Sequence, residues 1–218
     1  AERLAETREA DDVRRRHADF FAELEEQAYA HRFDAEAEWS ARLELDQDDL
    51  RAALDWLEAN DADSALELAG ALGWFWLSHG LLDEGRERLS RSLAASTAAG
   101  GPRARALAGS GAIVARRGEP AEGRAQLEEA IALWRELGDL DEVASALNSL
   151  GWLLIYDAGD DPGALVAFEQ SRDLRRQLDD PAGEVRALVG VAQVLVALGD
   201  TEQGEAISHE LLARADGN

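Results

Sequence analysis

The chain has 218 residues, with 45 acidic against 22 basic side chains and a formal net charge of −23 at pH 7. A field of this sign repels phosphate backbones and anionic lipid headgroups, which argues against direct binding of nucleic acid or membrane. The absence of cysteine excludes disulfides, thiolate metal sites and cysteine nucleophiles, and it suits a reducing cytoplasm.

The sequence carries no targeting or membrane-spanning pattern. No apolar run approaches the roughly 18 residues that a membrane helix needs, and the first residues do not form a secretory signal. The chain contains no methionine and starts at Ala1. We therefore expect a processed chain or a piece cut from something longer.

Strong helix formers, chiefly Ala, Leu, Glu and Arg, dominate the sequence, which predicts an all-α protein. Residues 1–30 are rich in charge and carry apolar side chains at three- and four-residue spacing, as an amphipathic helix does. Residues 36–59 carry a second amphipathic pattern. We expect residues 1–61 to form an N-terminal helical segment that packs on the rest of the chain.

Four glycines recur at intervals of 38, 41 and 40 residues, and each is followed five positions later by a second small residue. They are Gly80, Gly118, Gly159 and Gly199. Each follows the last apolar residue of a helical pattern, where a left-handed cap favours glycine. A period of this length is typical of a solenoid. Residues 62–214 are therefore predicted to form about four repeats, at 62–98, 102–138, 141–179 and 182–214, in a solenoid of paired helices.

A second set of glycines lies inside the predicted helices. These are Gly73, Gly111 and Gly151 in the first helices of the repeats, and Gly85, Gly123 and Gly204 in the second helices. Glycine inside a helix costs up to about 1 kcal/mol relative to alanine. Its recurrence at matched positions predicts that helix backbones approach closely there.

This combination of a small residue in each helix, a Leu or aromatic residue one turn on, and paired helices resembles the tetratricopeptide repeat. The resemblance covers about 62–214, with a period longer than the usual 34 residues. It implies an all-α, right-handed superhelix of antiparallel helix pairs, a solenoid whose inner groove binds a protein or peptide partner.

Three segments of the first half resemble a narrower family, the STAND-type (NB-ARC-containing) bacterial transcriptional regulators and ATPases. They are EADDVRRRHADFFAELEEQA at 9–28, LELDQDDLRAALDWL at 43–57 and SALELAGALGWFWLSHGLLDEGRERLSRSL at 64–93, and LWRELGD at 133–139 is also similar to that family. The resemblance implies a helical sensor arm beside an ATPase switch and often a DNA-binding or cyclase domain. The chain contains no GxxxxGK[ST] motif, so ATPase activity does not carry over to it.

No motif of catalysis, metal binding or cofactor binding stands out. Asp157, Asp160 and Asp161 bracket a glycine and could bind a divalent cation, but capping of the following helix explains them equally well. The four histidines are scattered without a ligand-like spacing. We expect no catalytic residue, metal or cofactor; an enzyme would require a deep pocket with converging titratable groups.

The register set by the two classes of glycine predicts which side chains line the inner groove. They are Trp74, Arg105, Arg116, Asn148, Trp152, Tyr156, Arg186 and Gln193. Arginine and asparagine can clamp a carboxylate or phosphate, and Trp and Tyr offer anchoring surface. Two alternatives stay open: Trp74 and Trp152 could pack between repeats, and the arginines could simply pair with neighbouring glutamates.

We expect a non-catalytic binding and sensor module of a larger bacterial signalling regulator. A protein, peptide or small effector in the groove would bias a neighbouring ATPase or DNA-binding domain, which requires different affinities for two states of the protein. The alternative is a freestanding scaffold that joins two proteins. Self-association through Trp74 or the last repeat, where the polar Ser208 occupies the position of a large apolar residue, is a further possibility.

Overall fold

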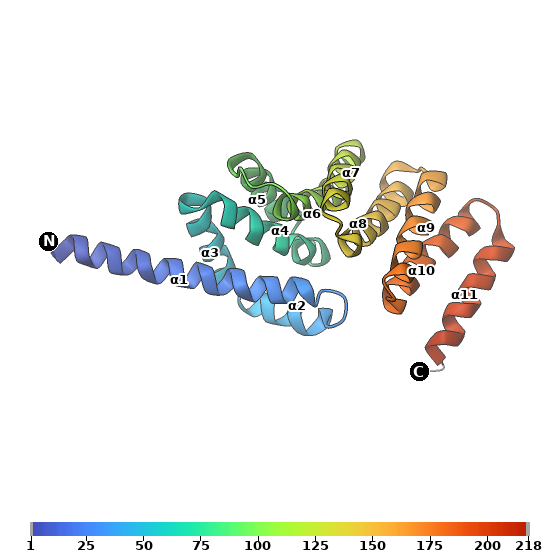
Figure 1. Cartoon of the computed structure of the whole chain (residues 1–218), viewed down its shortest axis with the longest axis horizontal. Coiled ribbons are helices and arrows are strands. Elements are labelled where there is room, and N and C mark those ends of the chain that lie inside the picture. The colour runs from blue at the N-terminus through green and yellow to red at the C-terminus, as the bar shows by residue number, and fades with distance from the viewer. Residues whose placement is uncertain (1, 217–218) are drawn as a thin grey trace. The chain divides into compact units, whose positions relative to one another are not determined.

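The structure, a computed structural model, describes the backbone of residues 2–216 and the side chains of residues 9–156 and 159–214. This part of the chain contains eleven α-helices, one π-helical turn and no strand, which confirms the prediction of an all-α protein. The helices form two compact units, residues 1–110 (unit 1) and residues 111–218 (unit 2). Each unit is described by itself (Figure 1).

Unit 1 contains five helices and most of a sixth. They are α1 (Glu2–Ala30), α2 (Glu36–Leu45), α3 (Gln47–Asn60), α4 (Ala62–Ser78), α5 (Leu82–Ala95) and α6 (Gly101–Arg116), whose last residues belong to unit 2. The long helix α1 packs against α3 and α4, and α4 packs against α5 (Figure 1). The amphipathic pattern at 36–59 forms two helices, because the chain leaves helical geometry at Asp46, between α2 and α3.

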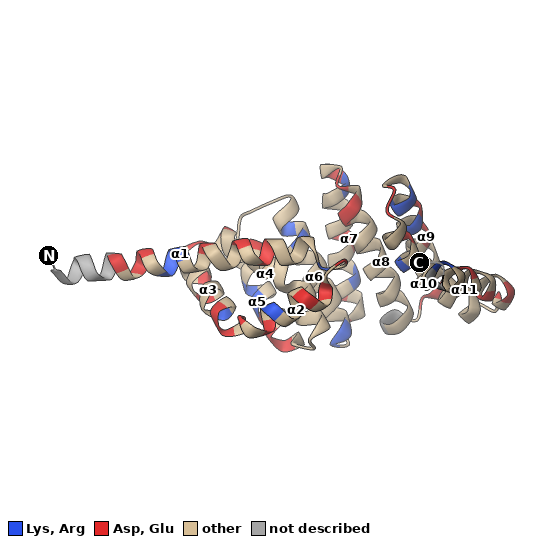
Figure 2. Cartoon of the chain, turned by 90° about the horizontal axis from the view of Figure 1, so that it is seen from below, with Lys and Arg blue, Asp and Glu red and all other residues tan. Residues whose placement is uncertain are grey.

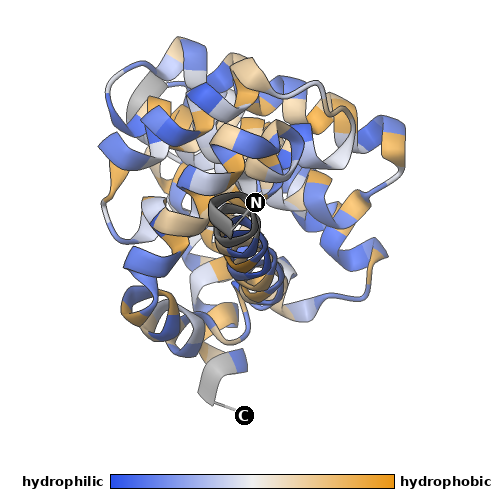
Figure 3. Ribbon diagram, turned by 90° about the vertical axis from the view of Figure 1, so that its left-hand side faces the viewer, coloured by the Kyte–Doolittle hydropathy of each residue, from blue (hydrophilic) through white to orange (hydrophobic). Residues whose placement is uncertain are grey.

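Apolar stripes account for this packing. Helix α1 buries apolar side chains at three- and four-residue spacing, among them Ala18, Phe21, Leu24 and Ala28, so one face of the helix meets the unit. Figure 3 shows that hydrophilic and hydrophobic residues are interspersed along the helices. Acidic residues occur on most helices (Figure 2), as the charge of the chain requires.

The linker between α5 and α6 is held to the start of α4 by one carboxylate. Asp63 Oδ1 accepts hydrogen bonds from Ser96 Oγ at 2.6 Å and from the backbone N–H groups of Thr97 and Ala98 at 3.0 and 3.1 Å. The hydrogen bond from Ser96, followed by those from the backbone, holds the pKa of Asp63 below its ordinary value.

Unit 2 contains the end of α6 and five further helices. They are α7 (Pro120–Leu137), α8 (Leu140–Leu153), α9 (Asp161–Gln177), α10 (Pro181–Ala197) and α11 (Thr201–Asp216), with the π-helical turn η1 (Leu154–Ala158) between α8 and α9. From α7 onward each helix packs against the next (Figure 1). Each predicted repeat interval contains two helices, whereas the compact units divide inside α6; the predicted boundary at residue 61 stays a prediction.

The turns follow the expected chemistry. Gly80, Gly118, Gly159 and Gly199 all have positive φ, at 70°, 91°, 66° and 91°, so the left-handed geometry predicted for these positions is confirmed. Asp160 caps α9, because its Oδ1 accepts a hydrogen bond from the Gly163 backbone N–H at 3.0 Å. The capping interpretation therefore holds for Asp160, and the side chain of Asp157 lies outside the described residues.

The glycines inside the helices mark close crossings in unit 2. A Cβ on Gly123 would lie 2.5 Å from the Gly111 carbonyl oxygen, so the backbones of α6 and α7 meet there. The Phe168 ring lies between two glycines: a Cβ on Gly151 or Gly190 would come within 2.7 or 2.5 Å of it. The predicted close approach of helix backbones is confirmed at Gly111 and Gly123, whereas Gly151 makes room for the Phe168 ring and not for a second backbone.

Candidate partner-binding surface

The eight residues predicted to line a groove fall into both units. Trp74 and Arg105 belong to unit 1; Arg116, Asn148, Trp152, Tyr156, Arg186 and Gln193 belong to unit 2. Their surroundings differ, because helix α1 contacts the first set and much of the second set faces solvent.

In unit 1, both predicted residues contact α1. Trp74 is half-buried, and its indole Nε1–H donates to Glu25 Oε1 at 3.2 Å. Arg105 forms a two-pronged ion pair with Glu26, with Nη2 at 3.2 Å from Oε1 and Nη1 bound to the other oxygen. The Arg105 guanidinium also lies over the Tyr29 ring, 4.1 Å from its centroid. The pairing of arginine with glutamate, one of the two alternatives, is thus present at Arg105.

In unit 2, three predicted residues meet in what we call the aromatic–amide cluster: Trp152, Tyr156 and Gln193. The Trp152 and Tyr156 rings are stacked, with centroids 5.7 Å apart and an interplanar angle of 6°. Gln193 Nε2 donates to Tyr156 Oη at 2.8 Å, which ties α10 to the turn η1 after α8. The Tyr156 side chain is 59% exposed, so the cluster presents an aromatic face to solvent.

The cluster rests on buried packing. The Trp152 ring meets the Phe168 ring edge-on, with centroids 5.0 Å apart and an interplanar angle of 72°, and Phe168 is fully buried. Trp152 therefore packs on the core of unit 2, which was one of the two alternatives, and it also stacks on exposed Tyr156; its place in a binding groove stays a prediction.

A local irregularity places Tyr156. The α-helical hydrogen bonding of α8 gives way after Leu153 to the π-helical turn η1, which contains Tyr156 and ends at Gly159. Single π-helical turns are rare and occur frequently at functional sites. The π-helical turn was not predicted from the sequence.

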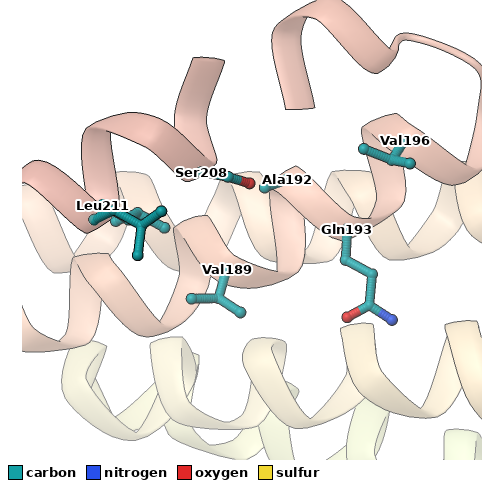
Figure 4. Close-up of a pocket in the computed structure, with 7 residues that line it drawn as sticks. Val189, Ala192, Gln193, Val196, Ser208 and Leu211 are labelled. Atoms are coloured by element: carbon teal, nitrogen blue, oxygen red, sulfur yellow. The ribbon is translucent and has the colours of Figure 1, made fainter. Parts of the chain in front are cut away.

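Beside the cluster, a pocket of about 570 Å³ opens between α10 and α11 (Figure 4). Its lining consists of Val189, Ala192, Gln193, Val196, Ser208, Leu211 and Leu212. Gln193 belongs to both the pocket and the cluster, and it projects from the same side of α10 as Val189 (Figure 4).

The sequence reasoning missed most of this pocket. Val189 and Val196 are 45% and 46% exposed and flank Gln193 on α10. Their spacing of four and three residues from Gln193 places all three on one helix face. These two valines could have indicated an exposed apolar face on α10. The helix is apolar on most sides, however, so the sequence does not distinguish this face from the buried ones.

The remaining predicted residues of unit 2 do not join the cluster. Asn148 lies one turn before Trp152, and its buried Oδ1 has no hydrogen-bond partner among the described residues. Arg186 is half-buried, with Nη2 3.8 Å from Asp180 Oδ2. Arg116 is exposed at the end of α6.

The described residues do not bring together three or more His, Asp or Glu side chains in a way that could hold a metal ion. None of the helices within the described range is long and apolar enough to cross a membrane. The chemistry offered by the cluster and the pocket is that of a binding surface, with aromatic faces, an amide and an apolar hollow.

Comparison with known proteins identifies the repeats. Residues 102–177 match the family model described as the tetratricopeptide repeat. The chain is also 31% identical over 192 residues to proteins from Mycobacterium bovis and Mycobacterium tuberculosis that are described as candidate HTH-type transcriptional regulators. The alignment covers 82% of this chain and 21% of each relative, so the chain spans about a fifth of the length of these curated relatives.

Solved structures show the same fold. BtubC (BKLC) from P. vanneervenii is similar with a TM-score of 0.68 at 20% identity, over 96% of this chain and 93% of that one. MamA is similar with a TM-score of 0.57 at 19% identity, over 82% of this chain and 95% of that one. Residues 102–177 are therefore tetratricopeptide repeats, and the chain has the all-α fold of a tetratricopeptide-repeat solenoid.

Proposed function

We propose that this chain is the non-catalytic binding module of a larger bacterial regulator and that it holds a protein or peptide partner on unit 2. Tetratricopeptide-repeat folds typically serve as scaffolds for protein interaction. The observation that carries the proposal is the aromatic–amide cluster, with exposed Tyr156 stacked on Trp152, beside an apolar pocket.

The physical chemistry of this surface suits a peptide. Trp and Tyr are the residues that contribute most to protein interfaces, because they bury large areas at small entropic cost. A pocket of about 570 Å³ lies in the range that admits an anchoring side chain or a small ligand. The unpartnered Asn148 Oδ1 is an acceptor that a donor on the partner would satisfy.

The regulator context rests on the relatives. Proteins described as HTH-type transcriptional regulators align with most of this chain and extend far beyond it. In a protein of that kind, a partner on unit 2 would bias a neighbouring ATPase or DNA-binding domain if it bound one state of the whole protein more tightly. A freestanding scaffold is the second candidate; it requires the same surface but no such coupling.

A matched pair of substitutions tests the binding surface. The immobilised chain would be used to select peptides from a random phage-displayed library, and each peptide would then be titrated against variants. We expect Val189→Glu to weaken binding at least about tenfold, which corresponds to about 1.4 kcal/mol, because it places a charge beside the cluster. Tyr156→Ala should weaken binding by a similar factor.

The control is Val166→Glu, which makes the same change at a 53% exposed valine of α9 outside the pocket lining, and binding should stay within about twofold. The proposal would be contradicted if Val189→Glu and Val166→Glu weakened peptide binding equally, or if Tyr156→Ala left the affinity of the selected peptides unchanged. Loss of transcriptional control by Val189→Glu in the full-length regulator would favour the sensor over the scaffold.

A further inference from the structure

Unit 1 contains a carboxyl group in an unusual place. The Glu25 side chain on α1 has no exposed surface, although glutamate is almost never fully buried unless it is paired. Its Oε1 accepts the hydrogen bond from the Trp74 indole, and its Oε2 is buried without a hydrogen-bond partner among the described residues. An ionised carboxylate with one neutral donor is poorly stabilised there.

The neighbouring charges do not compensate for this burial. Arg105 on α6 is engaged by both carboxylate oxygens of Glu26 and by the Tyr29 ring. Glu26 opposes ionisation of Glu25, and Arg105 favours it only weakly. Helix α4 contributes the neutral Trp74. Helix α3 contributes Asp49, whose carboxylate contacts His17 two turns earlier on α1.

Glu25 therefore keeps its proton at neutral pH. Burial is the largest influence and raises the pKa of Glu25 to about 8, against 4.5 for the ordinary side chain, while the Trp74 hydrogen bond lowers it in part. The neutral acid fits this position, because a protonated carboxyl needs no counterion.

Helix α1 also covers the two residues of unit 1 that were predicted to line the groove, since Glu25 is the partner of Trp74 and Glu26 is the partner of Arg105. We propose that α1 is a releasable cover over Trp74 and Arg105, held in place while the Glu25 carboxyl carries its proton. This inference concerns unit 1 and does not depend on a partner at the aromatic–amide cluster of unit 2.

The direction of the pH effect follows from proton linkage. Glu25 in contact with α4 has a pKa of about 8, and released into water it returns to about 4.5. Between these values the docked state binds more protons, so docking weakens by up to about tenfold for each pH unit of increase. Docking of α1 is strongest below about pH 4.5, the pKa of the released side chain. It weakens as the pH rises towards about 8, the pKa of the docked side chain, and is constant above that pH.

Because the sequence contains no cysteine, spin labels attach only at cysteines that are introduced by mutation. Spin labels on Glu23→Cys and Glu67→Cys, at exposed positions of the neighbouring helices α1 and α4, would report their separation by double electron–electron resonance in the whole chain. We expect one narrow distance at about pH 6 and an added population of longer distances at about pH 9. Glu25→Gln, neutral at every pH, should keep the narrow distance throughout.

Two further variants make the result specific. Glu26→Gln keeps Glu25 but removes a charge that opposes its ionisation, so the pH response should persist and move to lower pH. Trp74→Phe removes the donor that lowers the pKa of Glu25, so the response should extend to higher pH even if Glu25→Gln fails to fold. The proposal would be overturned if the labelled chain with Glu25 in place gave the same distance distribution at about pH 6 and about pH 9. An unchanged pH response in Glu25→Gln would also overturn it, because the effect would then come from another group.

Discussion

Replacing Phe168 with alanine should lower the free energy of unfolding by about 3–5 kcal/mol, as for other buried aromatic residues. The Phe168 ring is fully buried on α9, and Gly151 on α8 and Gly190 on α10 allow both helices to approach it. Neither glycine has a side chain that could move into the vacated space, so the cavity would persist. Urea unfolding, followed by circular dichroism, measures the change as a shift of the midpoint.

The same substitution should disturb the aromatic–amide cluster, because the Trp152 ring rests edge-on against Phe168. Val166→Ala, two residues earlier on α9 and 53% exposed, is the matched control and should change stability by no more than about 0.5 kcal/mol. Similar losses from the two variants would mean that α9 is destabilised as a helix and that the position of the ring between two glycines is unimportant.

Replacing Gly111 with leucine should cost about 1–3 kcal/mol of stability, the usual range for overpacking. Two effects oppose each other here. Leucine favours the helix over glycine by up to about 1 kcal/mol, but a Cβ at Gly111 would lie 2.7 Å from the Gly123 carbonyl oxygen and 3.2 Å from the Leu127 backbone nitrogen. Backbone atoms yield only if α7 moves as a whole, so the steric cost exceeds the gain in helix propensity.

Gly101→Ala separates the two effects, because it lies on the same helix α6 and an added Cβ would meet no atom within 4 Å. It should leave the melting temperature unchanged or raise it slightly. A Gly111→Leu variant as stable as wild type would show that α6 and α7 do not cross as closely as the structure describes.

Most of the fold could be predicted because its determinants are local. The helices follow from periodic apolar residues, and the turns follow from glycines such as Gly118 and Gly199, whose positive φ is costly for other residues. The close crossing of Gly111 and Gly123 was also predictable, since glycine inside a helix is tolerated mainly where another group needs the space.

The binding surface could be predicted only in part. Helical register placed Trp152 and Tyr156 on one helix face, and their rings do stack, while their part in binding stays a prediction. Register could not reveal that Gln193, 37 residues later in the chain, donates a hydrogen bond to Tyr156. The pocket between α10 and α11 also escaped prediction, because it depends on how far two helices separate.

The sequence by itself therefore determined the helices, the turns between them and the positions where backbones touch, since these depend on residues close together in the chain. Only the tertiary structure decided which of the residues predicted to line the groove are exposed to solvent. Trp74 and Trp152 both follow a helix glycine, yet Trp74 lies against α1 through a hydrogen bond to Glu25, 49 residues away, whereas Trp152 supports exposed Tyr156. That difference arises from long-range packing, which no periodic pattern encodes.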